Sequence, residues 1–248
     1  SKNEQWTVRV TPNDGIADGP AGEATITVSN TPPTLSALVI TPTTNIYNDI
    51  TLTCSVVVTD PDEAPTPTYE WSIGSNVVAN GSTLNLANVG ASPGDVVTCT
   101  ASVTDGDGAT ASDNTTTTIE NRLPVVDSIS LSPSIVYTND TLTATAVFSD
   151  DDGQTVSGTY AWHVIDVATG TDTEVQNSSD NTLSGITYFD RDDEVYVIVT
   201  PNDGMNDGTP QTSTSTTIVN TPPEEPSISI SPDPASTQDD LICSVDTP

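Results

Sequence analysis

The sequence predicts an all-β fold built of tandem β-sandwiches, and two observations carry this prediction. Apolar and polar residues alternate with period two, as in 52–58 and 97–103, which is the pattern of half-buried strands. Longer phrases recur about every ninety residues, which indicates serial domains. Gly, Pro, Asn and Asp separate the alternating segments, and no stretch of useful length shows the 3.6-residue period of a helix.

The expected elements follow the same order in each copy. The phrase YNDITLTCSVVVTDPDE at 47–63 contains a strand that turns Leu52, Cys54 and Val56 to one face. YEW at 69–71 begins the next strand, VVTCTASV at 96–103 gives another, and TTTT at 115–118 belongs to the last strand of this copy. The order returns with YTNDTLTATAVFSDDDG at 137–153, YAW at 160–162 and VIVTPNDGMNDG at 197–208. Each copy therefore holds about seven short strands.

The recurring phrases also predict the domain boundaries. Val10, Val103 and Val199 align in the acidic phrases, and Asn30, Asn121 and Asn220 each lead into a proline-containing junction. This alignment gives complete domains at 30–120 and 121–219, preceded at 1–29 by the last two strands of an incomplete domain and followed at 220–248 by the first two strands of another. We interpret the chain as a window cut from a longer array.

The order Cys54, Trp71, Cys99 resembles the immunoglobulin pattern, with cysteines on strands B and F and a tryptophan on strand C. The DG endings and Asn-x-Pro junctions also look like the tandem immunoglobulin-like, PKD-like and cadherin-like repeats of large bacterial surface proteins. This resemblance implies tandem immunoglobulin-like sandwiches forming an elongated rod, and a Cys54–Cys99 disulfide, with two buried free thiols as the alternative. A disulfide implies an extracellular setting.

The second domain replaces the cysteine pair with apolar residues. Ala144 aligns with Cys54 and Val195 with Cys99, as expected for a buried pair. Cys243 also aligns with Cys54, but the leading fragment has Trp6 where a partner thiol would lie. This disfavours a filament in which the two terminal half-domains of neighbouring molecules complement each other.

The charge balance excludes whole classes of partner. Four Lys and Arg residues face thirty-five Asp and Glu residues, for a formal net charge of −31. Nucleic acid and anionic membranes are repelled by such a chain, whereas metal cations are attracted. No apolar run approaches the length of a membrane span, so direct membrane insertion is not expected.

Acidic turns predict calcium at one or both of the junctions that lead into the complete domains. In an immunoglobulin-like sandwich the B–C and F–G loops lie at the same end, and here they read DPDE and DGDG in the first domain and DDDG and NDGMNDG in the second. Hard oxygen ligands without His or Cys are those that Ca²⁺ prefers. The candidate ligands are Asn30, Asp60, Asp62, Asp105, Asp107, Asn121, Asp150, Asp152, Asn202 and Asp203. The alternative is a set of solvated hairpin turns, because Asp-Gly favours turns without any metal.

A cadherin-like stretch suggests a further junction. FDRDDEVYVIVTPNDG at 189–204 resembles the cadherin acidic–Arg–acidic segment followed by a strand and DG. The resemblance implies that Asp190 and Asp192 face the next junction, near Asn220. The first domain has ASPGD at 91–95 in this place and departs from the pattern.

The sequence offers little for catalysis. It contains no nucleophile-elbow, zinc-protease or P-loop motif, and its one histidine, His163, is expected on the outer, solvated face of a strand. We therefore expect a non-enzymatic extracellular spacer of a large adhesin or surface filament, rigidified by calcium at its domain junctions. Its partners would be neighbouring repeats and a cell-surface or matrix ligand. The alternatives are a glycan- or protein-binding module and a filament subunit that polymerises by complementation.

Overall fold

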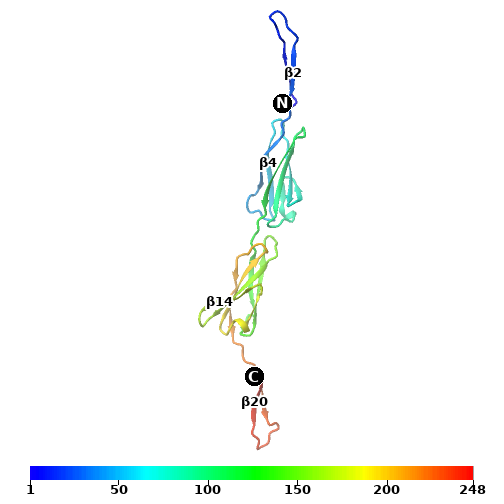
Figure 1. Cartoon of the computed structure of the whole chain (residues 1–248). Coiled ribbons are helices and arrows are strands. Elements are labelled where there is room, and N and C mark those ends of the chain that lie inside the picture. The colour runs from blue at the N-terminus through cyan, green and yellow to red at the C-terminus, as the bar shows by residue number, and fades with distance from the viewer. Residues whose placement is uncertain (248) are drawn as a thin grey trace. The chain divides into compact units, whose positions relative to one another are not determined.

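The computed structural model describes residues 1–247, and almost all regular structure in it is β-strand (Figure 1). The chain divides into two compact units, Ser1–Arg122 and Leu123–Pro248. Within the described residues, helix is confined to one 3₁₀ turn at Leu86–Asn88 and the four-residue α1 at Gly185–Tyr188. The predicted all-β class is therefore confirmed.

The first unit contains a seven-stranded sandwich that follows a hairpin. Its two sheets have the orders β3-β4-β7 and β6-β5-β8-β9, which are the A-B-E and C′-C-F-G sheets of an immunoglobulin-like sandwich. The strands are β3 (Thr34–Thr41), β4 (Thr51–Thr59), β5 (Thr68–Ile73), β6 (Asn76–Asn80), β7 (Thr83–Asn85), β8 (Val96–Thr104) and β9 (Thr110–Thr118).

The core of this sandwich is what the alternation predicts. Leu52 and Cys54 on β4 are buried, as are Val97, Cys99 and Ala101 on β8, while the residues between them are more exposed. Trp71 has no exposed surface, and its indole Nε1–H donates to the Gly81 carbonyl at 2.8 Å. Cys54 and Cys99 form a disulfide that joins the two sheets, and both cysteines lie in the same core cluster as Trp71.

The second unit repeats this architecture with two additions. One sheet has the order β10-β12-β15, and the other has the order β11-β18-β16-β13-β14, with the short β17 also pairing with β16. The strands are β10 (Val125–Ser132), β11 (Val136–Tyr137), β12 (Thr141–Ser149), β13 (Ser157–Asp166), β14 (Thr171–Ser178), β15 (Thr182–Ser184), β16 (Glu194–Asn202), β17 (Gln211–Thr212) and β18 (Thr216–Val219).

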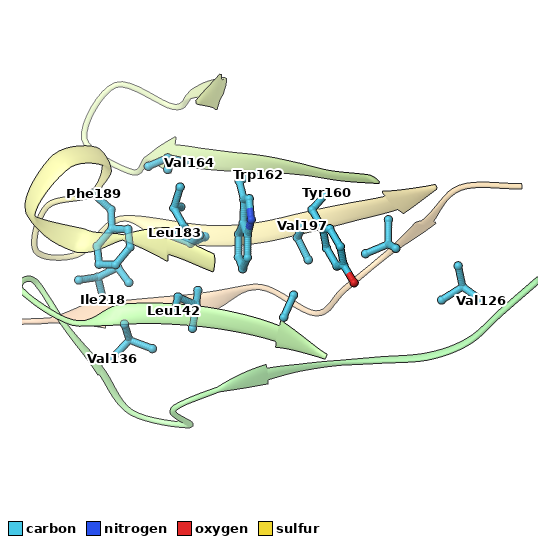
Figure 2. Packing of buried hydrophobic residues seen from close by; sticks show 13 residues of the cluster. Val126, Val136, Leu142, Tyr160, Trp162, Val164, Leu183, Phe189, Val197 and Ile218 are labelled. Atoms are coloured by element: carbon cyan, nitrogen blue, oxygen red, sulfur yellow. The ribbon is translucent and has the colours of Figure 1, made fainter. Parts of the chain in front are cut away.

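Figure 2 shows how the second core is filled. Trp162 reaches from β13 toward the opposite sheet, where Leu142 lies on β12, and Leu183 and Ile218 pack nearby. All four side chains are fully buried. The tryptophan that the sequence places on strand C is thus a core residue in both sandwiches.

The repeat alignment is wrong by two residues on one strand. Trp71 lies opposite Cys99 in the pairing of β5 with β8, and Trp162 lies opposite Val197 in the pairing of β13 with β16. The equivalent of Cys99 is therefore Val197, and not the predicted Val195. Because side chains alternate with period two, a shift of two keeps each residue on its face, and both valines are buried.

A two-stranded hairpin flanks each sandwich in the chain. The first pairs β1 (Gln5–Val10) with β2 (Gly22–Thr27), and the second pairs β19 (Ser227–Ser231) with β20 (Ile242–Thr247). Trp6 lies opposite Ile26 on an apolar face of the first hairpin, and its side chain is 63% exposed. Cys243 in the second hairpin is an exposed free thiol. The assignment of these hairpins to incomplete domains stays a prediction.

Candidate metal centre

Two acidic loops converge at one end of the first sandwich, as the sequence predicts. The loop after β4 supplies Asp60 and Glu63, and the loop after β8 supplies Asp105. One carboxylate oxygen from each of these three residues lies within 4.8 Å of the other two. We call the end of the sandwich formed by Asn30, Asp60, Asp62, Glu63, Asp105 and Asp107 the acidic pole.

Gly106 allows the two loops to approach this closely. Its backbone N–H donates to Glu63 Oε1 at 2.7 Å. A Cβ atom at this position would lie 3.0 Å from Glu63 Oε2, so any side chain would force the glutamate to move. Gly106 is therefore needed for the close contact between the two loops as well as for the turn.

Only one of the two carboxylate oxygens of Asp60 has hydrogen-bond donors, and both donors come from its own loop. Its Oδ1 accepts hydrogen bonds from the backbone N–H groups of Asp62 at 2.8 Å and Glu63 at 3.2 Å, which is an Asx-type turn. Its Oδ2 is buried and has no hydrogen-bond partner. A buried acceptor left unpaired costs roughly 1–3 kcal/mol, and a cation beside Oδ2 would remove this cost.

Asp105 is the most buried carboxylate of the pole, with 6% of its surface exposed. Its Oδ1 accepts from the backbone N–H groups of Asp107 and Ala109, and its Oδ2 accepts from Asn30 Nδ2 at 2.7 Å. The hydrogen bond from Asn30, followed by those from the backbone, lowers the pKa of the Asp105 carboxyl below its ordinary value. Asp105 is therefore held as a carboxylate, which is the form that binds a metal.

The segment that enters the sandwich is fastened to the same pole. Besides the bond from Asn30, the Thr31 backbone N–H donates to Asp62 Oδ2 at 2.7 Å. Asn30 Oδ1 is a second buried acceptor without a partner. The predicted convergence of two acidic loops and the incoming linker is thus present in this unit.

The predicted ligands of the first domain occupy different positions at the pole. Asp60 and Asp105 belong to the carboxylate cluster, and Asn30 is bonded to Asp105. Asp62 instead holds the Thr31 amide, and Asp107 pairs with Lys2. Whether any of these residues binds a metal stays a prediction.

Sequence reasoning missed Glu63 and Lys2. Glu63 stands in the quoted DPDE phrase, three residues after Asp60, and this spacing lets its backbone N–H bond to the Asp60 turn while its side chain turns to Gly106. Lys2 Nζ lies 2.9 Å from Glu63 Oε1 and 2.6 Å from Asp107 Oδ2. No sequence signal joins residue 2 to residues 63 and 107, because the contact depends on where the hairpin lies.

The second sandwich carries a related end with its own acidic loops. Asp150 Oδ1 accepts from the backbone N–H groups of Asp152 and Gln154, while Asp150 Oδ2 is buried without a partner, as at Asp60. The Gln154 Oε1 atom is likewise buried and unpartnered. Counted from the shared aspartate, Gly153 stands where the first loop has Glu63, so this loop has no side chain at that position.

The other candidates of the second sandwich lie in or near a tight turn. Asp203 is 6% exposed, and its Oδ1 accepts from the backbone N–H groups of Met205 and Asn206. Asn202 bonds to Asp207 and to the Gly204 amide within this turn. Across the described residues, only the first pole brings one ligand atom from each of three acidic or histidine side chains within 4.8 Å of the other two. The ligand roles of Asn121, Asp150, Asp152, Asn202 and Asp203 stay predictions.

The cadherin-like stretch lies near the predicted junction residue. Asp190 and Asn220 line the same surface hollow, together with Arg191. Asp192 has a positive φ of 75°, and its carboxylate pairs with Arg191 at 3.1 Å. A ligand role for Asp190 and Asp192 stays a prediction.

His163 is on the outer face, as predicted, but it is not simply solvated. Its ring stacks on Tyr196 with centroids 4.8 Å apart, and its Nδ1 lies 3.0 Å from Asp172 Oδ1. Its side chain is 18% exposed. The residue is therefore part of a polar cluster that joins β13, β14 and β16.

The oxygen atoms of the acidic pole suit a hard divalent cation. Asp60, Glu63 and Asp105 supply three carboxylates, and Asn30 supplies a neutral amide oxygen. Ca²⁺ accepts six to eight oxygen ligands, including water, in flexible geometry, whereas Mg²⁺ demands a stricter octahedron. The two unpartnered buried acceptors, Asn30 Oδ1 and Asp60 Oδ2, are the observation that fits a bound cation.

Comparison with known proteins shows resemblance only at the level of fold. No protein-family profile matches the sequence, and no curated protein matches it. Among the described residues, no helix has the length and apolar character needed to cross a membrane.

Several solved structures overlap the chain at low identity. Two fibronectin type III domains of chicken tenascin are 12% identical, with a TM-score of 0.37 over 74% of this chain and 98% of that chain. Three N-terminal domains of the highly immunogenic outer capsid protein of bacteriophage RB49 are 14% identical, with a TM-score of 0.34 over 87% of this chain and 89% of that one.

A third structure is described as a Ca²⁺-stabilized adhesin that helps an Antarctic bacterium reach out and bind ice. It is 15% identical, with a TM-score of 0.29 over 91% of this chain and 59% of that chain. Likeness this low carries no conclusion about function. The strand order within the two sandwiches of the present chain shows that it is a tandem array of immunoglobulin-like β-sandwiches.

Proposed function

We propose that this chain is a non-enzymatic, extracellular spacer region of an adhesin or surface filament, and that calcium at the acidic pole fixes the first sandwich to the segment that precedes it. The observation that carries the proposal is the pair of buried, unpartnered acceptors beside three clustered carboxylates. A cation there would bind oxygen atoms from two loops and from Asn30 at once. It would therefore link the sandwich to the incoming chain.

The extracellular setting and the mechanical role have separate support. The Cys54–Cys99 disulfide is typical of oxidising compartments. The strongly negative charge suits a soluble surface protein, and it opposes binding to nucleic acid and anionic membranes. Serial sandwiches joined by short proline-containing segments extend reach when each joint is stiffened.

Thermal melting with and without calcium tests the proposal. We expect chelation to lower the melting temperature of the wild-type chain, and the Asp60→Asn and Glu63→Gln substitutions to remove most of that calcium response. Loss of one carboxylate ligand at such a site is expected to weaken binding by about tenfold or more.

Asp113→Asn is the matched control. Asp113 is an exposed carboxylate on β9, and its Oδ1 accepts only a local backbone hydrogen bond from Asn114. The substitution removes the same charge outside the pole, so the calcium response should persist. Identical melting curves with and without chelator in the wild type would refute a structural role for calcium.

The alternative functions have one observation in their favour. Trp71 and Trp162 are buried and offer no aromatic platform for a ligand, but Trp6 is exposed on the apolar face of the first hairpin. A glycan- or protein-binding role, and complementation between copies, would both use this face. Quenching of Trp6 fluorescence by an added ligand would support the first, and concentration-dependent assembly that Trp6→Ser abolishes would support the second.

A further inference from the structure

Lys2 brings a positive charge to the acidic pole from outside the sandwich. It is the sole lysine of the chain, and it lies just before β1 of the leading hairpin. Its Nζ donates to Glu63 Oε1 at 2.9 Å and to Asp107 Oδ2 at 2.6 Å. One ammonium thus bridges a carboxylate from each of the two converging loops.

The contact is more than a loose surface pair. The Lys2 side chain is only 22% exposed, and Glu63 Oε1 also accepts the Gly106 backbone N–H. Bonds to Asp107 and Glu63 raise the pKa of the Lys2 ammonium above its usual range, so it stays charged throughout the neutral range. Isolated exposed pairs contribute little, but a cation shared by two loops constrains both.

Lys2 and a metal ion would share Glu63. The Oε1 atom of Glu63 accepts from the Lys2 ammonium and from the Gly106 backbone N–H, and one oxygen of the same carboxylate lies within 4.8 Å of Asp60 and Asp105 oxygens. The ammonium and the ion would therefore bind the same carboxylate group. Two cations so close repel each other, while both draw the same loops together.

We propose that the Lys2 ammonium takes the place of a second metal ion at the acidic pole: it limits the pole to one Ca²⁺ and keeps the leading hairpin fastened to the sandwich when calcium is removed. The calcium part of this inference rests on the proposed function, whereas the fastening does not. The second sandwich contains no lysine.

The first experiment measures calcium binding by titration calorimetry on the full chain. We expect Lys2→Gln to bind calcium about 5-fold or more tightly, or to take up one additional ion, because a neighbouring positive charge has been removed. Lys2→Arg, which keeps the charge, should stay within twofold of the wild type.

Unchanged or weaker binding by Lys2→Gln would overturn the calcium part. Unchanged binding would mean that the ion pairs of Lys2 are ordinary surface pairs with no influence on calcium. Weaker binding would mean that its main role is to hold Glu63 in position for the metal.

The second experiment uses hydrogen exchange in chelator, without any metal. The reporters are the Thr31 amide, which bonds to Asp62, and the Gly106 amide, which bonds to Glu63. We expect Lys2→Gln to speed exchange at both amides by about 3-fold or more, and Lys2→Arg to leave both near wild type. Equal rates in all three proteins would overturn the fastening role.

The two arms separate the proposals. If the wild-type chain binds no calcium at the pole but Lys2→Gln still speeds exchange, the proposed function fails and the fastening stands. If calcium binds as proposed but exchange is insensitive to Lys2, the fastening fails alone.

Discussion

Asp172 shows how a single carboxylate organises the outer face of the second sandwich. Its Oδ2 accepts the Tyr196 hydroxyl at 2.6 Å, and its Oδ1 faces His163 Nδ1. The hydrogen bond from Tyr196 comes first among the causes that lower the pKa of Asp172. The same bond raises the pKa of Tyr196 to about 12.

This bond predicts a pH dependence at the alkaline end. An ordinary tyrosine has a pKa of about 10, so the stability from the bond is fully present below about pH 10 and is lost as pH rises toward 12. Titration of tyrosinate absorbance should show a late component that Tyr196→Phe removes. Asp172→Asn should move that component back toward about pH 10. Burial also raises the pKa of Tyr160, so some late absorbance is expected to remain in both variants. A late component that neither substitution reduces would contradict the assignment.

The two acidic ends share one turn but differ in the residues around it. Asp60 and Asp150 form the same turn, and each leaves a buried Oδ2 without a partner. Glu63 adds a third carboxylate beside Asp60 and Asp105, and among the described residues only this end brings three such ligand atoms within 4.8 Å of one another. Carboxylates clustered this closely attract a divalent cation, because each offers a hard, charged oxygen.

At the level of elements, the two sandwiches fill matching core positions with different residues. β4 and β8 are joined by the Cys54–Cys99 disulfide, whereas Ala144 on β12 and Val197 on β16 fill the matching positions. Both pairs are buried beside the strand-C tryptophan. The second sandwich therefore shows that apolar packing suffices at these positions.

The double substitution Cys54→Ala, Cys99→Val places the second sandwich's pair in the first. We expect the first sandwich to fold but to lose stability, because the disulfide closes a loop with a sequence separation of 45. The chain-entropy treatment puts this loss at up to about 4 kcal/mol, and improved apolar packing offsets part of it. Denaturant unfolding followed by fluorescence would measure the change.

The second sandwich provides the internal control for that experiment. Its transition should not move, since the substituted residues lie in the other compact unit. A first transition that keeps its midpoint after the double substitution would show that the disulfide adds no stability.

At the scale of the whole molecule, the main feature is a large excess of negative charge. The formal net charge is −31, and each of the four basic side chains already has an acidic partner: Lys2 with Glu63 and Asp107, Arg9 with Glu23, Arg122 with Asp49 and Arg191 with Asp192. Four basic residues cannot neutralise thirty-five acidic ones. Self-repulsion of this kind destabilises a compact state and is screened by salt.

Screening and specific calcium binding can be separated on the whole chain. Raising sodium chloride from about 10 mM to about 150 mM shortens the Debye length from about 30 to about 8 Å, so the melting temperature should rise modestly. Calcium chloride at the same ionic strength should raise it further, because an ion bound only to the folded state adds its binding free energy. Equal melting temperatures in the two salts would show that calcium acts only by screening charge and not by binding to a specific site.

The sequence by itself determined which side chains are inside. Alternation placed Leu52, Cys54 and Trp71 in the core, because a strand turns successive residues to opposite faces whatever it pairs with. It also placed two acidic loops at one end, because the fold class fixes which loops are neighbours.

Only the tertiary structure decided the exact register and the partners at the acidic pole. A shift of two residues leaves every face unchanged, so alternation could not distinguish Val195 from Val197 as the residue opposite Trp162; the backbone hydrogen bonds between β13 and β16 do. Lys2 and Glu63 meet across a sequence separation of 61. No local pattern encodes such a contact, because it exists only once the hairpin and the sandwich are both folded.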